Sequence, residues 1–164
     1  MGAIQQDYLE ALKYFMQIAR QVWPKDPSNP LSYRPAPRNK GENLPVGYAA
    51  ASAGYIGRMY LRGEGVKANA AIAKMWFERG VEYGDRECHN GLGIIYRDGL
   101  IKGLKPDVVK AANHFGKAAG QELAEAQVNL AKIHYGELLL CGSQYHISLI
   151  ASRTRRHWKS HHLL

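Results

Sequence analysis

Residues Gly57 to Phe77 have the sequence GRMYLRGEGVKANAAIAKMWF, and this stretch decides the fold. It predicts the end of one helix, a glycine turn and the start of a second helix. Gly63 and Gly65 allow the positive φ that ends a helix without a Cβ clash. Asn69 suits the N-cap of the second helix, because its side-chain oxygen can accept from a backbone N–H that lacks a helical partner.

The same pattern returns downstream at a nearly fixed distance. Gly-x-x-Tyr-x-x-Gly occurs at 57–63 and again at 93–99, which is 36 residues later. The Asn/Asp-x-x-x-Ala-x-x-x-Phe that follows occurs at 69–77 and again at 107–115, which is 38 residues later, so the second turn carries two extra residues. A partial copy stands at 7–15. A repeat of this length predicts a stacked helical array.

We therefore predict an all-α fold, namely an α-solenoid of antiparallel helix pairs. Helices are expected at 7–23, 48–61, 69–83, 86–97, 107–119 and 122–135. The predicted organisation is a partial repeat with only its second helix (1–23), a proline-rich loop (24–47), the repeats (48–136) and a tail outside the pattern (137–164). The loop holds six of the seven prolines, which predicts a long irregular segment that is either a binding element or an insertion without a role.

Charge and hydropathy favour a solvated surface over a nucleic-acid or membrane site. The formal net charge is +8, but the tail contributes four basic side chains against one acidic one, and the rest of the excess is scattered. No spacing of basic and aromatic residues typical of RNA binding is present. No apolar run approaches the roughly 18 residues of a membrane span. Residues 1–7 lack the features of a secretory signal, so we expect neither a signal peptide nor an anchor in this chain.

The sequence predicts no catalytic, cofactor-binding or metal site. Cys88 and Cys141 lack metal-ligand spacing, and Cys88 stands where the repeat expects alanine, which indicates a small buried thiol. A disulfide between the two cysteines stays open. The Gly63-x-Gly65 turn lacks a third glycine and follows a helix, which argues against a phosphate-binding loop. No Gly-x-Ser-x-Gly motif indicates a nucleophile.

At this level of detail the residues resemble a known family, the Sel-one-like repeat, a relative of the tetratricopeptide repeat. The resemblance rests on one whole unit and most of a second, and it covers roughly residues 7–23 and 48–136. The matching positions are Ile56-Gly57, Tyr60, Gly63, Gly65-Val66, Asn69, Ala73, Trp76-Phe77 and Gly84 in the first unit, and Leu92-Gly93, Tyr96, Gly99, Asp107, Ala111, Phe115 and Ala118-Ala119 in the second. The chain departs from the pattern at 101–104, where the glycine turn is longer, and at Ala131 and Glu137, which replace glycines.

Within that family, the chain is similar to one group of adaptors, which sit beside the membrane ubiquitin ligase of endoplasmic-reticulum-associated degradation. The similarity rests on the sequence at 57–66, the proline-rich insertion and residues 129–134. The resemblance implies a non-enzymatic scaffold whose partners are that ligase and misfolded or lectin-bound client proteins. It places the full-length protein in the lumen of the endoplasmic reticulum, with the cytoplasm as the alternative location. Two other classes of protein share the repeat. One comprises signalling or cell-wall regulators similar to activators of chitin synthase. The other comprises bacterial repeat enzymes with a regular cysteine pair in each unit, and the presence of only two cysteines in this chain argues against that class.

The expected binding face is the concave surface formed by the first helix of each pair. It is predicted to comprise Tyr55, Arg58, Met59, Arg62, His89, Tyr96 and Arg97. The tail allows three hypotheses: a nuclear import signal in the basic run 153–159, a histidine metal site at His157, His161 and His162, and a capping helix at 138–151. A disordered tail is favoured over the metal site, and short basic runs such as 153–159 are common by chance.

Overall fold

The computed structural model describes residues 2–26, 29–33 and 46–140. It confirms the all-α solenoid prediction. The helices in these ranges are α1 (Gly2–Val22), α2 (Val46–Arg62), α3 (Ala70–Val81), α4 (Arg86–Asp98), α5 (Val108–Ala119) and α6 (Ala124–Leu140). The chain divides into two compact units, Met1–Leu130 and Ala131–Leu164, and the fold below is that of the first unit.

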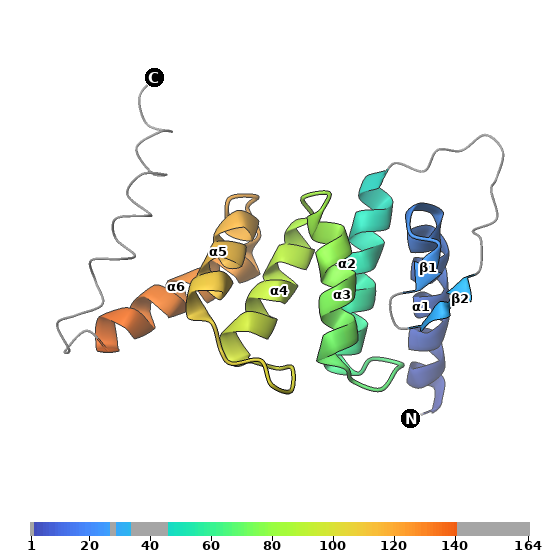
Figure 1. The fold of residues 1–164 in the computed structure, drawn as a ribbon, viewed down its shortest axis with the longest axis horizontal. Coiled ribbons are helices and arrows are strands. Elements are labelled where there is room, and N and C mark those ends of the chain that lie inside the picture. The colour runs from blue at the N-terminus through green and yellow to red at the C-terminus, as the bar shows by residue number, and fades with distance from the viewer. Residues whose placement is uncertain (1, 27–28, 34–45, 141–164) are drawn as a thin grey trace, which may run out of the picture. The chain divides into compact units, whose positions relative to one another are not determined.

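The helices of this unit are arranged as successive neighbours. Helices α1 to α5 stand side by side in chain order (Figure 1). Helices α2 and α3 form one antiparallel pair, and α4 and α5 form the next. Helix α3 contacts α4, and the two first helices, α2 and α4, also contact each other. The first helices therefore meet along one side of the unit, as a solenoid requires.

Each second helix begins at the N-cap that the sequence predicts. The Asn69 side chain accepts from the backbone N of Ala71 at 3.0 Å and of Ile72 at 3.1 Å. The Asp107 carboxylate accepts from Lys110 N at 2.9 Å. These oxygens satisfy backbone donors that have no partner inside the helix.

The two extra residues of the second turn leave its closing hydrogen bond unchanged. Asn69 N donates to Tyr60 O at 2.7 Å, and Asp107 N donates to Tyr96 O at 2.8 Å. The longer turn is accommodated at 101–104, where Leu104 N donates to Ile101 O at 2.8 Å. The repeat therefore tolerates the insertion because both helix ends are fixed by the same bond.

The repeated glycines make room for the repeated phenylalanine. A Cβ added at Gly57 would lie 2.5 Å from the ring of Phe77, and one at Gly91 would lie 2.4 Å from the same ring. Phe77 thus lies against a glycine of its own pair and a glycine of the next pair. Gly93 and Phe115 repeat the first of these contacts at 2.5 Å.

Two apolar clusters fill the space between the helices. The first joins α1, α2 and α3, and the second joins α3 and α4. Cys88 belongs to the second cluster and is fully buried, with its Sγ 3.8 Å from the carbonyl oxygen of Ala50. Burial raises the pKa of the Cys88 thiol far above its usual range, since a thiolate there would lose its hydration. The prediction of a small buried thiol is confirmed.

The structure corrects the expectation that 24–47 is irregular throughout. Residues Lys25–Asp26 (β1) and Asn29–Tyr33 (β2) form a short antiparallel pair, in which Lys25 faces Tyr33 and Asp26 faces Asn29. Antiparallel pairing gives backbone groups partners that an irregular segment would have to find in water. The rest of the proline-rich segment, 34–45, lies outside the described residues.

Several helix ends also differ from the expected bounds. Helix α1 begins at Gly2, so Asp7 lies inside it. Helix α6 begins at Ala124, because Glu122 adopts a left-handed φ of 61°. Gly84 takes the equivalent φ of 75° in the previous turn. Helix α6 continues to Leu140, past the expected limit of the repeats at 136. Cys141 and the three hypotheses for the tail fall outside the described residues, except that 138–140 of the proposed capping helix belong to α6.

Candidate functional site

A groove of about 270 Å³ lies between α2 and α4. Helix α2 contributes Tyr55, Arg58 and Arg62, which are three and seven residues apart and so share one face. Helix α4 contributes Glu87, Asn90 and Ile94 with the same spacing, and the first turn of α6 contributes Glu125. The groove is therefore built from the first helices, the surface on which the sequence places the binding site.

An aromatic stack forms part of the α2 side. The ring of Tyr55 lies parallel to that of Phe15 from α1, with centroids 4.7 Å apart and planes 9° apart. The guanidinium carbon of Arg58 lies 5.0 Å from the Tyr55 centroid. Tyr55 is nevertheless 44% exposed. A supported and exposed tyrosine provides a rigid contact surface at little entropic cost, which is typical of protein interfaces.

Charges of both signs line the groove in equal number. The basic residues are Arg58, Arg62 and Arg86, and the acidic residues are Asp85, Glu87 and Glu125. Some of these groups are already engaged, since Arg62 lies 3.7 Å from Glu64, and Arg86 donates to the carbonyl oxygen of Gln121 at 2.9 Å. The groove consequently carries no net charge that would select strongly acidic or strongly basic partners.

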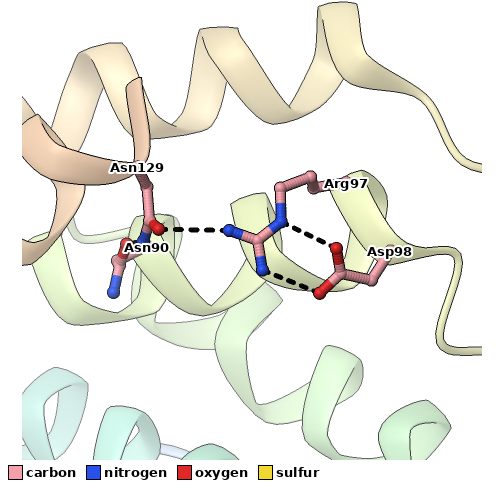
Figure 2. Close-up of polar contacts among 4 residues, drawn as sticks. All are labelled: Asn90, Arg97, Asp98 and Asn129. Atoms are coloured by element: carbon pink, nitrogen blue, oxygen red, sulfur yellow. Dashed lines mark hydrogen bonds and ion pairs between the residues drawn. The ribbon is translucent and has the colours of Figure 1, made fainter. Parts of the chain in front are cut away.

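A chain of polar side chains runs from the groove toward the C-terminal end of α4 (Figure 2). Arg97 binds both carboxylate oxygens of Asp98, at 2.7 and 2.8 Å. Its Nη1 donates to Asn129 Oδ1 at 3.1 Å, and Asn129 Nδ2 donates to Asn90 Oδ1 at 3.2 Å. Asn90 and Asn129 are only 3% and 7% exposed. Asn129 thus connects Asn90 of the groove wall to the Arg97–Asp98 ion pair.

The ion pair at the end of this chain is charged over the physiological range. The hydrogen bond from Arg97 is the main cause that holds the pKa of Asp98 below its usual value. The same contact raises the pKa of Arg97. Arg97 therefore acts only as a donor toward Asn129.

The family model of the Sel1 repeat matches residues 1–21, 48–85, 86–122 and 124–143. The chain belongs to the Sel1 repeat family. Among solved structures, the chain is similar to the crystal structure of a Sel1 repeat protein from Oxalobacter formigenes, with 32% identity over 51% of this chain and a TM-score of 0.47. The match spans 34% of that protein's length. No curated protein matches the chain.

The family model confirms the resemblance found in the sequence, and Sel1 repeats indicate a protein-interaction scaffold. The family model also covers residues 1–21, where the sequence shows only a partial repeat. The specific similarity to adaptors of endoplasmic-reticulum-associated degradation stays a prediction. None of the described helices combines the length and hydropathy needed to cross a membrane.

The structure brings together three of the seven residues predicted for the Sel1 binding face. Tyr55, Arg58 and Arg62 line the groove. Met59 and His89 do not line it, because Met59 packs in the interior and His89 faces His114 of α5. A residue one position along a helix is rotated by about 100°, which moves these two side chains away from the groove.

The remaining two predicted residues, Tyr96 and Arg97, belong to α4 but do not line the groove. Tyr96 stacks on His114 of α5, with ring centroids 5.6 Å apart and planes 11° apart. Arg97 belongs to the polar chain described above. Neither is a groove-lining residue, and both instead hold neighbouring elements together.

A histidine pair joins the two helices of the second Sel1 unit. His89 Nδ1 and His114 Nδ1 are 3.1 Å apart, so one ring must donate while the other accepts. Burial lowers the pKa of His114 to about 4, with the nearby His89 and Lys117 adding to the effect. Burial also lowers the pKa of His89. Within the described ranges, no group of three His, Cys, Asp or Glu side chains is placed to hold a metal ion.

Sequence reasoning missed Asn90, Asn129, Glu87 and Glu125. One signal was available, because asparagine is a poor helix former and Asn90 stands in the middle of a helix. A polar residue at such a position indicates a role for its amide. The partnership with Asn129, 39 residues away, has no signal in a single sequence.

Proposed function

We propose that the groove between α2 and α4 is the site at which this scaffold holds a segment of a partner protein. The observation that carries the proposal is the convergence of Tyr55, Arg58 and Arg62 on one hollow beside a buried asparagine. An exposed aromatic ring, arginines and a polar group at one concave place match the composition of protein-binding hot spots. The groove is formed by first helices, which the repeat architecture presents on one side.

We propose further that the full-length protein is an adaptor of endoplasmic-reticulum-associated degradation. The support is the sequence similarity at 57–66, the proline-rich insertion and residues 129–134. In this role the partners are a membrane ubiquitin ligase and misfolded or lectin-bound clients, and the repeats face the lumen. A cytoplasmic or cell-wall regulatory scaffold is the competing function, and no catalytic role is expected in either case.

Site-specific photocrosslinking tests the proposed groove. A photoreactive phenylalanine analogue replaces Tyr55 in the protein expressed in its own cells. Tyr48 is the matched control, because it is an exposed tyrosine on the same helix that does not line the groove. We expect one set of partner peptides to be crosslinked from position 55 and not from position 48. Equal crosslinking from both positions, or none from position 55, would contradict the groove as the binding site.

The identity of the crosslinked proteins tests the finer role. Recovery of a membrane ubiquitin ligase subunit together with luminal lectins or their clients supports the degradation adaptor. Recovery of cytosolic signalling or cell-wall proteins instead overturns that role and leaves the scaffold in place. The two parts of the proposal can therefore fail separately.

A further inference from the structure

We propose that the groove recognises the main chain of an extended partner segment, through an N–H donor of Asn90 whose direction is fixed by Asn129, Arg97 and Asp98. The inference rests on the proposed function, because it specifies what the groove binds. It assigns one side-chain amide to recognition and three residues to its positioning.

The direction of the hydrogen bonds follows from the chemistry of Arg97. A guanidinium has donors and no acceptor, so the group of Asn129 that faces it must be the carbonyl oxygen. The nitrogen of Asn129 must then face Asn90, and Asn90 can accept only through its own oxygen. The two orientations of an asparagine amide are usually hard to tell apart, but here the bidentate Arg97–Asp98 pair determines both amides.

This arrangement leaves the Nδ2 of Asn90 for the groove. Figure 2 shows this nitrogen turned away from Asn129. Among the described residues no acceptor is placed against it, although the Asn90 side chain is almost completely buried and lines the groove. Asn90 Nδ2 is not among the fully buried, unpartnered polar atoms of the described residues, so water can reach this hydrogen in the free groove, and a loosely held water costs little to displace. A partner that supplies an oxygen to this hydrogen therefore gains a hydrogen bond for which the site is already organised.

The charges around the groove select the kind of oxygen. Glu87 and Glu125 line the same groove, and the basic and acidic groups balance. A carboxylate would meet the two glutamates without a compensating excess of positive charge. A main-chain carbonyl is a neutral acceptor, and every residue of an extended segment carries one. The groove thus fits an extended polypeptide bound through its backbone, with Tyr55 as the side-chain contact.

Random peptides of about twelve residues, displayed as a library and selected on the whole chain, provide the probe. Peptides are kept if they reduce crosslinking from the photoreactive residue at position 55 to the partner protein. Their dissociation constants for the unmodified chain are then measured by calorimetry. Each backbone amide is then replaced in turn by an ester, because an ester carbonyl accepts a hydrogen bond more weakly than an amide carbonyl. We expect one position at which the ester weakens binding, and this loss should be absent with the Asn90→Asp variant.

Two charge-matched variants test the donor and its positioning. Asn90→Asp replaces the donor by an oxygen, and Asn129→Asp turns the Asn90 nitrogen away from the groove because the new carboxylate accepts from it. Each should weaken peptide binding by about tenfold or more. Asn113→Asp, at an exposed position of α5, carries the same charge change and should leave binding within about twofold.

Nuclear magnetic resonance of the unmodified chain keeps the test independent of the stability of the variants. Addition of peptide should shift the two side-chain amide protons of Asn90 far more than those of Asn113. If peptides bind in the groove without moving the Asn90 signals, or if the ester scan is flat, main-chain recognition is wrong while the groove proposal survives. If no selected peptide protects position 55, main-chain recognition is also wrong. The crosslinking experiment in cells then decides the proposed function separately.

Discussion

At the scale of single residues, the glycines of the Sel1 motif allow neighbouring helices to pack closely. Gly93 of α4 lies against the ring of Phe115 from α5, and an added Cβ would come within 2.5 Å of that ring. We expect Gly93→Ala to lower the free energy of unfolding by about 1–3 kcal/mol, because a buried ring must move to admit the methyl group. Urea denaturation followed by circular dichroism measures the change.

A second helical glycine provides the matched control for that substitution. Gly116 of α5 has nothing within 4 Å of an added Cβ. Gly116→Ala should therefore raise the free energy of unfolding by about 0.5–1 kcal/mol through helix propensity alone. Phe115→Leu, with its smaller side chain, should reduce the cost of Gly93→Ala in a double-mutant cycle. An equal effect of alanine at both glycines would show that the ring contact does not explain the motif.

At the scale of elements, the contact between α4 and α5 depends on pH through His89 and His114. The pKa of His114 is about 4 in the folded chain and about 6.5 when unfolded. Well above pH 6.5 His114 is neutral in both states and has no pH-dependent effect. As pH falls from 6.5 toward 4, the unfolded chain binds protons that the folded chain does not bind, so the free energy of unfolding decreases.

We therefore expect the urea midpoint to fall between pH 7.5 and pH 5. Replacement of both histidines by glutamine should flatten this dependence, because glutamine does not titrate. The window stays above the range in which Asp98 and Asp107, whose pKa values are lowered by their hydrogen bonds, begin to bind protons. An unchanged slope in the double variant would assign the pH dependence to other groups.

The helices and strands also show which features of the structure can be predicted from the sequence. Asn69 and Asp107 start their helices as predicted, because capping is a local interaction between residues two or three apart. The groove is less accessible to prediction, because a shift of one position along α4 exchanges His89, which faces α5, for Asn90, which lines the groove. Long-range contacts give no sequence signal at all, as with Asn129 and Asn90. The β1–β2 pair is similarly hidden, since prolines normally argue against strands.

At the scale of the molecule, the first unit is held together by side chains that belong to more than one repeat. Phe77 lies against glycines of both α2 and α4. Cys88 of α4 contacts the backbone of α2 at Ala50, and a Cβ added at Gly80 of α3 would come within 2.2 Å of its Sγ. Neighbouring repeats that share such contacts are expected to unfold together rather than one at a time.

The reactivity of Cys88 measures this coupling directly. Its thiol is fully buried and its pKa is raised by burial, so a disulfide reagent can attack only after α4 separates from α2 and α3. In a Cys141→Ser variant, which leaves Cys88 as the single thiol, we expect slow labelling without urea. The free energy of opening should decrease with urea as steeply as that of global unfolding, because exposing Cys88 requires breaking the contacts of three helices. A clearly smaller slope would mean that α4 detaches alone, and the groove between α2 and α4 would then be a site that opens without unfolding the unit.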